Sequence, residues 1–214
     1  MEPPKREDSY RTAYKKAQAD LEGLNLIERA KSAGFIVESH PEGVAIFKFL
    51  GQDVKILLEE RVVVDASSGE PLPLWSQILI LHHIRDIKDN IFPSYKWITF
   101  KEVPSGEFYL SAFDKRTKEL AIKFFGDNLD LIHSVAPKIG GEPYSGVGGD
   151  ISYLFKLFPK IPVVLVVYKP DEEFSADAKL LFDETIPDLM CTEDIAVIST
   201  MLVIRLGEAL QEIG

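Results

Sequence analysis

Residues 34–66, GFIVESHPEGVAIFKFLGQDVKILLEERVVVDA, decide the fold class of this 214-residue chain. The stretch holds four runs rich in valine, isoleucine and phenylalanine, and links of only two or three residues separate them. Parallel neighbours need a crossover of roughly a dozen residues or more, so links this short join only antiparallel strands. The stretch therefore predicts a meander of three or four antiparallel strands.

Helical periodicity precedes and follows this predicted meander. Between residues 9 and 33 apolar side chains recur three and four positions apart, which predicts an amphipathic helix over about residues 9–33, interrupted near Gly23. After the meander, Pro73 lies near the start of a predicted helix over residues 74–88. Residues 78–81 of this helix are all apolar, so we expect it to be largely buried.

The second half of the chain predicts a hairpin preceded by helices. Two apolar runs, DISYLFKLF at 150–158 and IPVVLVVYK at 161–169, follow each other closely and predict antiparallel strands. Before them, residues 113–126 and 128–140 have helical patterns that each end at a glycine.

A final helix and the absence of a linker complete the predicted fold. The helix runs from Glu193 to about Ile213, with Thr192 as its expected N-cap. No internal repeat and no low-complexity linker divides the sequence. We therefore predict one α+β domain over residues 1–214 with no separable second domain. Its mainly antiparallel sheet, formed by the N-terminal meander and the C-terminal hairpin, is covered by helices.

The composition of the chain excludes several kinds of partner and cofactor. An apolar content of 46% is enough for a core without a metal or disulfide staple. The 34 acidic residues outnumber the 24 basic ones, which argues against a nucleic-acid partner because phosphates require a basic surface. No secretory signal and no membrane-spanning apolar run is visible, so we expect a cytoplasmic protein with no membrane partner. Cys191 is the only cysteine, which excludes a cysteine-ligated iron–sulfur cluster within this chain.

An acidic stretch at residues 171–194 is the most distinctive feature, with nine acids and one base. Asp171, Glu172 and Glu173 follow an apolar strand, where carboxylates commonly bind hard cations or act as acids and bases. In the other interpretation, Asp171 caps a turn, the two glutamates lie in water, and apolar residues from Phe174 to Phe182 anchor the segment to the core. No calcium-loop motif is present, which favours the second interpretation.

A glycine-rich connector, IGGEPYSGVGGD at residues 139–150, forms a candidate loop with Gly146, Gly148, Gly149 and Asp150. A phosphate-binding loop leads from a strand into a helix, whereas this connector follows a helix and precedes a strand. Turn formation is the favoured role, and closure over a ligand is the alternative, because glycine lets the backbone approach closely.

Histidine offers a further candidate in the predicted helix 74–88. His82 lies one turn before Asp86, where the carboxylate is placed to orient the imidazole ring of a ligand or catalytic histidine. A histidine that is simply satisfied within a buried helix is the simpler interpretation. Cys191 precedes a helix N-terminus, a position that lowers the pKa of a thiol, but no nearby histidine or asparagine completes a nucleophilic site.

Residues 149–199 resemble the domain of unknown function 3786 family. The matching features are Pro159-x-x-Pro162 before an apolar strand, Asp171-x-Glu173-Phe174, Leu181-Phe182-Asp183, Glu193-Asp194 at the last helix, and His82 in the upstream helix. The resemblance extends over nearly the whole chain. The resemblance implies a cytoplasmic protein. Some of the relatives that it implies carry a separate cysteine-rich iron–sulfur motif. It implies no catalytic residue.

Two functions of different classes follow from the residues and the resemblance. The preferred one is a binding or accessory domain that serves a redox or cofactor-handling protein partner in anaerobic metabolism, with the glycine-rich loop and the acidic strand end as its recognition surface. The alternative is a metal-dependent or carboxylate–histidine enzyme that uses His82 with residues 171–173. A third possibility is a subunit that assembles through its N-terminal helix. The sequence specifies no cofactor, substrate or oligomeric state.

Overall fold

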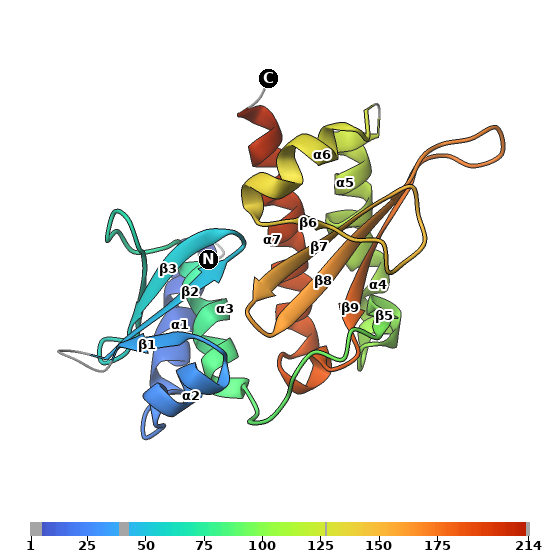
Figure 1. Cartoon of the computed structure of the whole chain (residues 1–214). Coiled ribbons are helices and arrows are strands. Elements are labelled where there is room, and N and C mark those ends of the chain that lie inside the picture. The colour runs from blue at the N-terminus through green and yellow to red at the C-terminus, as the bar shows by residue number, and fades with distance from the viewer. Residues whose placement is uncertain (1–5, 39–42, 127, 213–214) are drawn as a thin grey trace, which may run out of the picture. The chain divides into compact units, whose positions relative to one another are not determined.

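The computed structural model describes residues 6–38, 43–126 and 128–212. Contacts between Cα atoms divide the chain into two compact units, the first made of Met1–Lys48 with Gln52–Ile91 and the second of Phe49–Gly51 with Phe92–Gly214. Figure 1 shows the helices and strands of both units. The first predicted link of the meander, at residues 40–42, lies outside the described residues.

The first unit begins with two helices where the sequence predicted one interrupted helix. Helix α1 covers Arg6–Ala19 and helix α2 covers Leu26–Ser32. Gly23 separates them with a φ of +76°, a left-handed conformation that glycine adopts without steric cost. Asn25 starts the second helix, because its side-chain oxygen accepts a hydrogen bond from the Glu28 N–H at 3.3 Å. The predicted interruption near Gly23 is confirmed.

A four-stranded sheet confirms the predicted meander. The strands follow each other in chain order, β1-β2-β3-β4, and cover Ile36–Glu38, Val44–Phe49, Gln52–Leu57 and Val62–Asp65. The pairs β1/β2 and β3/β4 are antiparallel.

Helix α3 covers Leu74–Asp86 and is buried along most of its length, as predicted. Pro73 is its N-cap residue, so the helix begins immediately after the proline, and it ends two residues earlier than the sequence suggested. Arg29 of α2 donates hydrogen bonds to the carbonyl oxygens of Ile84, at 2.7 Å, and Ile87, at 3.0 Å. The guanidinium thereby satisfies carbonyl groups that the end of a helix leaves without partners.

The second unit is built on a five-stranded antiparallel sheet in the order β5-β9-β8-β7-β6. These strands cover, in the same order, Trp97–Thr99, Asp177–Asp183, Ile161–Tyr168, Ile151–Phe158 and Glu142–Pro143. The predicted hairpin is confirmed as β7 and β8, whose register pairs Ile151 with Val167. Every residue of β8 except Tyr168 is buried, in keeping with its continuous apolar sequence.

Strand β9 arises from the acidic stretch. It pairs with β8 on one side and with β5 on the other, and its Ala178, Leu180 and Phe182 side chains are buried. The expectation that Phe174 anchors this segment to the core is wrong, because 69% of Phe174 is exposed. Phe174 precedes the first residue of the strand, so it has no place on either face of the sheet.

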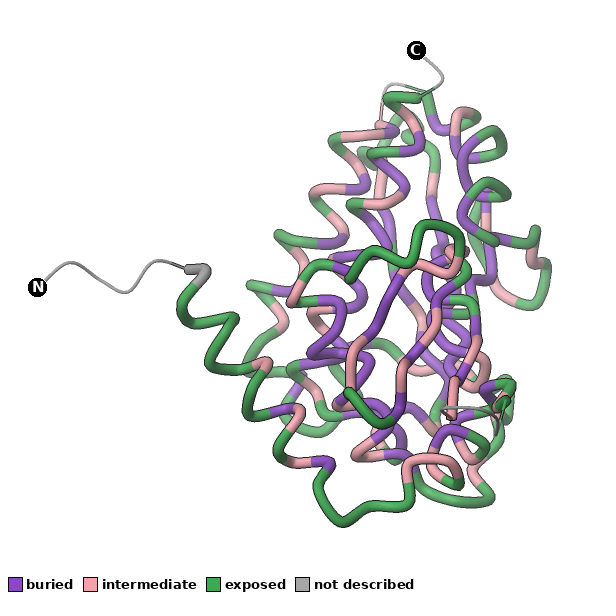
Figure 2. The backbone as a smooth tube through the Cα atoms, turned by 90° about the vertical axis from the view of Figure 1, so that its left-hand side faces the viewer, coloured by how far each residue is buried: buried purple, intermediate pink, exposed green. Residues whose placement is uncertain are grey.

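Helices cover one face of this sheet, and Figure 1 shows α4, α5 and α7 together behind β7, β8 and β9. The α-helices and 3-10 turns of the second unit are η1 Phe100–Glu102, α4 Gly106–Arg116, α5 Lys118–Phe125, α6 Leu131–Val135, η2 Ala136–Ile139, η3 Ile186–Asp188 and α7 Thr192–Gln211. The rings of Phe100 and Phe113 stack at 3.9 Å, and each lies within 6.4 Å of the Phe182 ring. Figure 2 shows buried residues alternating with exposed ones along the helices.

The predicted N-cap of the last helix is wrong by one residue. Cys191 occupies the cap position of α7, and Thr192 is the first helical residue. The Thr192 hydroxyl donates a hydrogen bond to the Pro104 carbonyl oxygen at 2.6 Å, so it joins the helix to the loop before α4 instead of capping its own helix.

The α+β class and the antiparallel pairing are confirmed, but the meander and the hairpin belong to two sheets and not to the one sheet that the sequence suggested. The expectation that residues 1–214 form a single domain stays a prediction. In the part of the chain that the structure describes, no helix combines the length and the apolarity that a membrane span requires.

Candidate functional site

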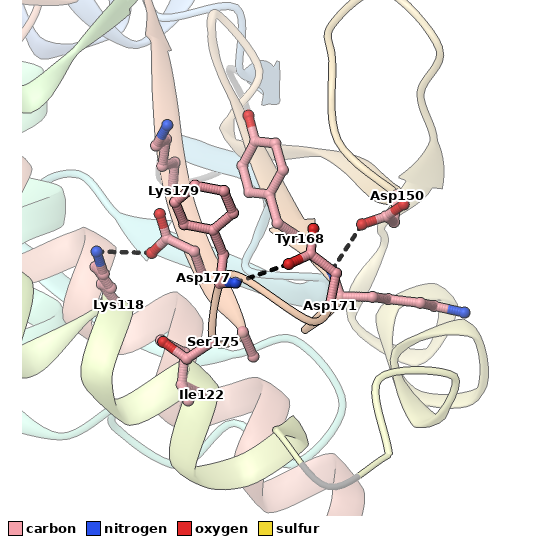
Figure 3. A pocket seen from close by; sticks show the side chains of 11 residues that line it. Lys118, Ile122, Asp150, Tyr168, Asp171, Ser175, Asp177 and Lys179 are labelled. Carbon is pink, nitrogen blue, oxygen red and sulfur yellow. Dashed lines mark hydrogen bonds and ion pairs between the residues drawn. The ribbon is translucent and has the colours of Figure 1, made fainter.

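Two groups of residues that the sequence singled out line one pocket of the second unit. The pocket has a volume of about 570 Å³ and is lined by Asp150, from the end of the glycine-rich loop, and Asp171, from the acidic stretch. Its other walls come from α5, from the end of β8 and from the start of β9, as Figure 3 shows. The structure thus brings together two of the candidates from separate segments.

The hairpin explains why these two segments meet. Because Ile151 pairs with Val167, the residues that precede β7 and those that follow β8 emerge at the same end of the sheet. Asp150 is fixed there by two hydrogen bonds. Its N–H donates to the Val167 carbonyl oxygen at 3.0 Å, and its Oδ2 accepts from the Lys169 N–H at 2.6 Å.

Asp171 caps a tight turn at the edge of the pocket. Its Oδ1 accepts hydrogen bonds from the N–H groups of Phe174, at 2.7 Å, and Glu173, at 2.9 Å. Its own N–H donates to the Phe174 carbonyl oxygen at 2.9 Å, which closes the turn. The two amide donors, from Phe174 and Glu173, lower the pKa of Asp171, so its carboxylate carries a negative charge at neutral pH. Glu172 and Glu173 are exposed, as the turn-capping interpretation expects.

Three lysines also line the pocket, and each has a defined partner. Lys118 of α5 forms an ion pair of 2.6 Å with Asp177, and the hydrogen bond to this carboxylate raises the pKa of Lys118. Lys169 pairs with Asp130 at 3.2 Å. The ammonium group of Lys179 lies 5.0 Å from the centre of the Tyr168 ring. Figure 3 shows the ion pair of Lys118 and the position of Lys179.

The glycine-rich loop lies over the face of the sheet opposite the helices. There Leu154, Val164 and Val166 form a buried cluster against which Tyr144 and Trp97 pack. The Trp97 indole N–H donates a hydrogen bond to the Tyr144 hydroxyl at 3.1 Å, which attaches the loop to β5.

The candidate glycines of this loop differ in what the structure requires of them. Gly149 has a φ of +106°, and a Cβ atom there would lie 2.4 Å from Cγ1 of Val166. Close backbone approach therefore demands glycine at this position. A Cβ atom on Gly146 would lie 2.5 Å from the Tyr144 hydroxyl oxygen, whereas one on Gly148 would meet no atom within 4 Å. The turn-forming interpretation thus holds most clearly at Gly149.

A second hollow, of about 470 Å³, lies beside this loop and shares Asp150 with the first. His133 of α6 lines it, and the His133 Nδ1 atom is hydrogen-bonded to the buried Tyr153 hydroxyl at 2.8 Å. The sequence pattern around His133 is that of an ordinary helix and does not single it out. Its partner lies 20 residues away on β7, so no local pattern reveals the pair.

His82 and Asp86 lie on α3 in the first unit. Both carboxylate oxygens of Asp86 accept hydrogen bonds from the neighbouring Arg85, from Nε and Nη2 at 2.7 Å each. This bidentate pair raises the pKa of Arg85 and holds the Asp86 charge against the guanidinium. His82 is half-buried. Because His82 belongs to the first unit and Asp171 to the second, their convergence in one site stays a prediction.

A metal site and a reactive thiol at Cys191 are the remaining candidates that the sequence offers. Within residues 6–38, 43–126 and 128–212, no three histidine, cysteine, aspartate or glutamate side chains are grouped so that they could hold a metal ion. Cys191 is a free, exposed residue. Desolvation of its sulfur nevertheless raises the pKa of the thiol, opposite to the lowering expected at a helix N-terminus.

Comparison with known protein families identifies a match that covers most of the chain. The sequence model of the family described as Domain of unknown function (DUF3786) matches residues 25–205, which include both hollows and α3. No curated protein and no solved structure matches the chain.

Proposed function

Since the chain belongs to the family described as Domain of unknown function (DUF3786), whose description specifies no activity, we propose its function from the geometry of the second unit. The protein is a binding or accessory domain, and its recognition site is the 570 Å³ pocket lined by Asp150 and Asp171. The observation that carries this proposal is the meeting of these two carboxylates, from separate segments, on one concave surface.

Fixed side chains support a binding role. Backbone N–H groups hold the carboxylate oxygens of Asp150 and Asp171, so neither group has to be ordered when a ligand arrives. Preorganisation of this kind reduces the entropic cost of association. Ile122 and the exposed Phe174 add apolar surface to the same pocket, which gives it the mixed lining typical of ligand sites.

The proposed partner is a redox or cofactor-handling protein of anaerobic metabolism, in the cytoplasm. This part of the proposal depends on the resemblance to proteins of which some carry a separate cysteine-rich iron–sulfur motif. With Cys191 as its only cysteine, this chain leaves any cysteine-ligated cluster to the partner. In this proposal the partner carries the cluster and this chain binds the partner, which makes it an accessory protein.

Co-purification under anaerobic conditions tests the recognition site. We would compare the tagged full-length wild type with the double variant Asp150→Asn, Asp171→Asn, which removes both charges but keeps a side-chain oxygen to accept the amide hydrogen bonds. The matched control is Asp53→Asn, which removes an exposed carboxylate of the first unit that pairs with Lys48. We expect at least one protein that binds the wild type and the control but not the double variant.

Identical capture by all three forms, with the double variant folded, would show that the pocket is not the recognition site. Elemental analysis and native mass spectrometry of the same samples test the enzyme alternative. A stoichiometric metal that is lost in His82→Ala and in Asp171→Asn would favour a metal-dependent enzyme over an accessory domain.

A further inference from the structure

The pocket already holds a positively charged group against an aromatic ring. Tyr168 is the last residue of β8 and Lys179 lies on the neighbouring strand β9, and the Lys179 ammonium is 5.0 Å from the ring centre. A cation over the face of a tyrosine is attracted by the negative charge density of the ring. Figure 3 shows both side chains on the pocket wall. In this structure the Lys179 ammonium therefore occupies the position over the Tyr168 ring where a cation binds.

The charged side chains that line the pocket favour a cationic ligand, because two of the three lysines are already neutralised by ion pairs within the protein. Lys118 is neutralised by Asp177 at 2.6 Å, and Lys169 by Asp130 at 3.2 Å. Among the residues that the structure describes, the hydrogen bonds to the carboxylates of Asp150 and Asp171 come from backbone N–H groups, which leave the full negative charge in place. Among the described residues, Lys179 is the lysine of the three whose partner is the ring of Tyr168 and not a carboxylate.

We infer that this pocket binds a primary amine or guanidinium on an apolar stem, which takes the place of the Lys179 ammonium over Tyr168. The chemistry is that of a lysine or arginine side chain of a partner, or of a free alkyl amine. The inference rests on the proposed function of the same pocket and specifies its ligand.

Apolar surface next to the cation position suits such a stem. Ile122 of α5 and Ala176 line the pocket, and Phe174 presents a ring that is 69% exposed. Lysine and arginine bury their methylene groups along apolar surface while the charged end keeps polar partners. The turn that Asp171 closes holds Phe174 in this position through two hydrogen bonds to that residue, one from its N–H and one to its carbonyl oxygen.

An anionic ligand fits less well, although three lysines line the pocket. An anion would have to compete with Asp177 for Lys118 at an ion-pair distance of 2.6 Å, and with Asp130 for Lys169. It would also approach the carboxylates of Asp150 and Asp171, whose repulsion opposes it.

Titration of the full-length chain, followed by the amide resonances of Lys169 and Phe174 in ¹H–¹⁵N NMR spectra, tests the inference. The probes are n-butylammonium, 1,5-diaminopentane and a glycine-flanked peptide with a single lysine; inorganic phosphate is the anionic comparison. The variants are Lys179→Met, which removes the internal cation, and Tyr168→Leu, which removes the ring. Tyr109→Leu is the control, because Tyr109 is an exposed tyrosine of α4 that lines a different hollow.

We expect Lys179→Met to bind the amines about two- to five-fold more tightly than the wild type, the range that an exposed cation–π contact supplies. Tyr168→Leu should weaken binding by a similar factor, and Tyr109→Leu should leave it unchanged. Tighter binding of the peptide than of the free amines identifies a protein side chain as the ligand, and the reverse identifies a small amine. Either order supports the inference.

The inference is wrong if no amine shifts the pocket resonances of Lys179→Met, or if phosphate binds more tightly than every amine. Should Tyr168→Leu fail to fold, Lys179→Met decides alone, since Lys179 is an exposed residue.

Failure of the amine inference is distinct from failure of the proposed function. If the double variant Asp150→Asn, Asp171→Asn no longer binds the protein partner but no amine binds the pocket, the pocket is still the recognition site, for a ligand of another kind.

Discussion

The carboxylate of Asp183, of which only 1% is exposed, accepts a hydrogen bond of 2.5 Å from the backbone N–H of Tyr95, 88 residues earlier in the chain. The same carboxylate accepts hydrogen bonds from the N–H and the hydroxyl of Thr185, at 3.0 and 2.6 Å. It joins the segment before β5 to the end of β9. One of the nine acids of the acidic stretch is therefore a buried structural residue and not part of a solvated edge.

Removal of this carboxylate should destabilise the protein substantially. Asp183→Ala removes the acceptor of the hydrogen bonds from Tyr95 and Thr185, and a hydrogen bond to a charged group contributes about 1.5–3 kcal/mol. We expect a loss of about 3 kcal/mol in the free energy of unfolding, measured by urea titration. Glu172→Ala, at an exposed acid of the same stretch, should change it by less than about 0.5 kcal/mol. Equal effects of the two substitutions would contradict the structural role of Asp183.

The turn at Asp171 predicts a dependence on pH. Because the N–H groups of Phe174 and Glu173 lower the pKa of Asp171, the charged carboxylate stabilises the folded turn above the unfolded value of about 3.9. This stabilisation is lost as the pH falls through the lower pKa of the folded state. A ¹³C NMR titration of the carboxyl group should give a midpoint below about 3.9. A midpoint at or above that of an unstructured peptide would show that the turn does not form in solution.

Two neighbouring glycines provide a matched pair of substitutions. Gly149→Ala places a side chain at a φ of +106° and 2.4 Å from Val166 Cγ1, so it should lower stability by about 1–3 kcal/mol. Gly148→Ala meets no atom within 4 Å and should be nearly neutral. Thermal unfolding of the two variants measures the difference. Similar midpoints would mean that the loop does not approach the sheet at Gly149.

Calorimetry tests whether residues 1–214 form one domain. One continuous hairpin contributes to both compact units, because β3 lies in the first, while Phe49, the last residue of β2, and the turn residues 50–51 belong to the second. We therefore expect a single unfolding transition with equal calorimetric and van't Hoff enthalpies. Two resolved transitions would instead assign the units to separate domains.

Much of the fold was accessible from the sequence wherever linkers were short and apolar runs were continuous. The meander and the β7–β8 hairpin belong to this class, since linker length alone excludes parallel pairing. Strand β9 was missed although Ala178, Leu180 and Phe182 have the period of two that a strand requires. The surrounding acids direct attention to a turn in water, and only the pairing of β9 with β5 and β8 shows that the segment is interior to the sheet.

The nearness of Asp150 and Asp171 in the candidate pocket could also have been predicted from the sequence. A hairpin from 151 to 168 places the residues before and after it at one end of the sheet, which already brings Asp150 near the segment that contains Asp171. The contribution of Lys118 depends on how α5 packs against β9, and the pair of His133 and Tyr153 depends on how α6 packs against β7. Helix packing of this kind leaves no local pattern in the sequence.

The single cysteine makes the chain well suited to site-specific labelling. Cys191 is exposed, and it precedes a 20-residue helix, so a maleimide dye would attach at one defined place in the second unit. Because burial of the sulfur raises the pKa of the thiol, coupling should be slow near neutral pH and faster in mildly alkaline buffer. With a second cysteine introduced at the exposed Ser67 of the first unit, energy transfer between two dyes would follow the spacing of the units during partner binding.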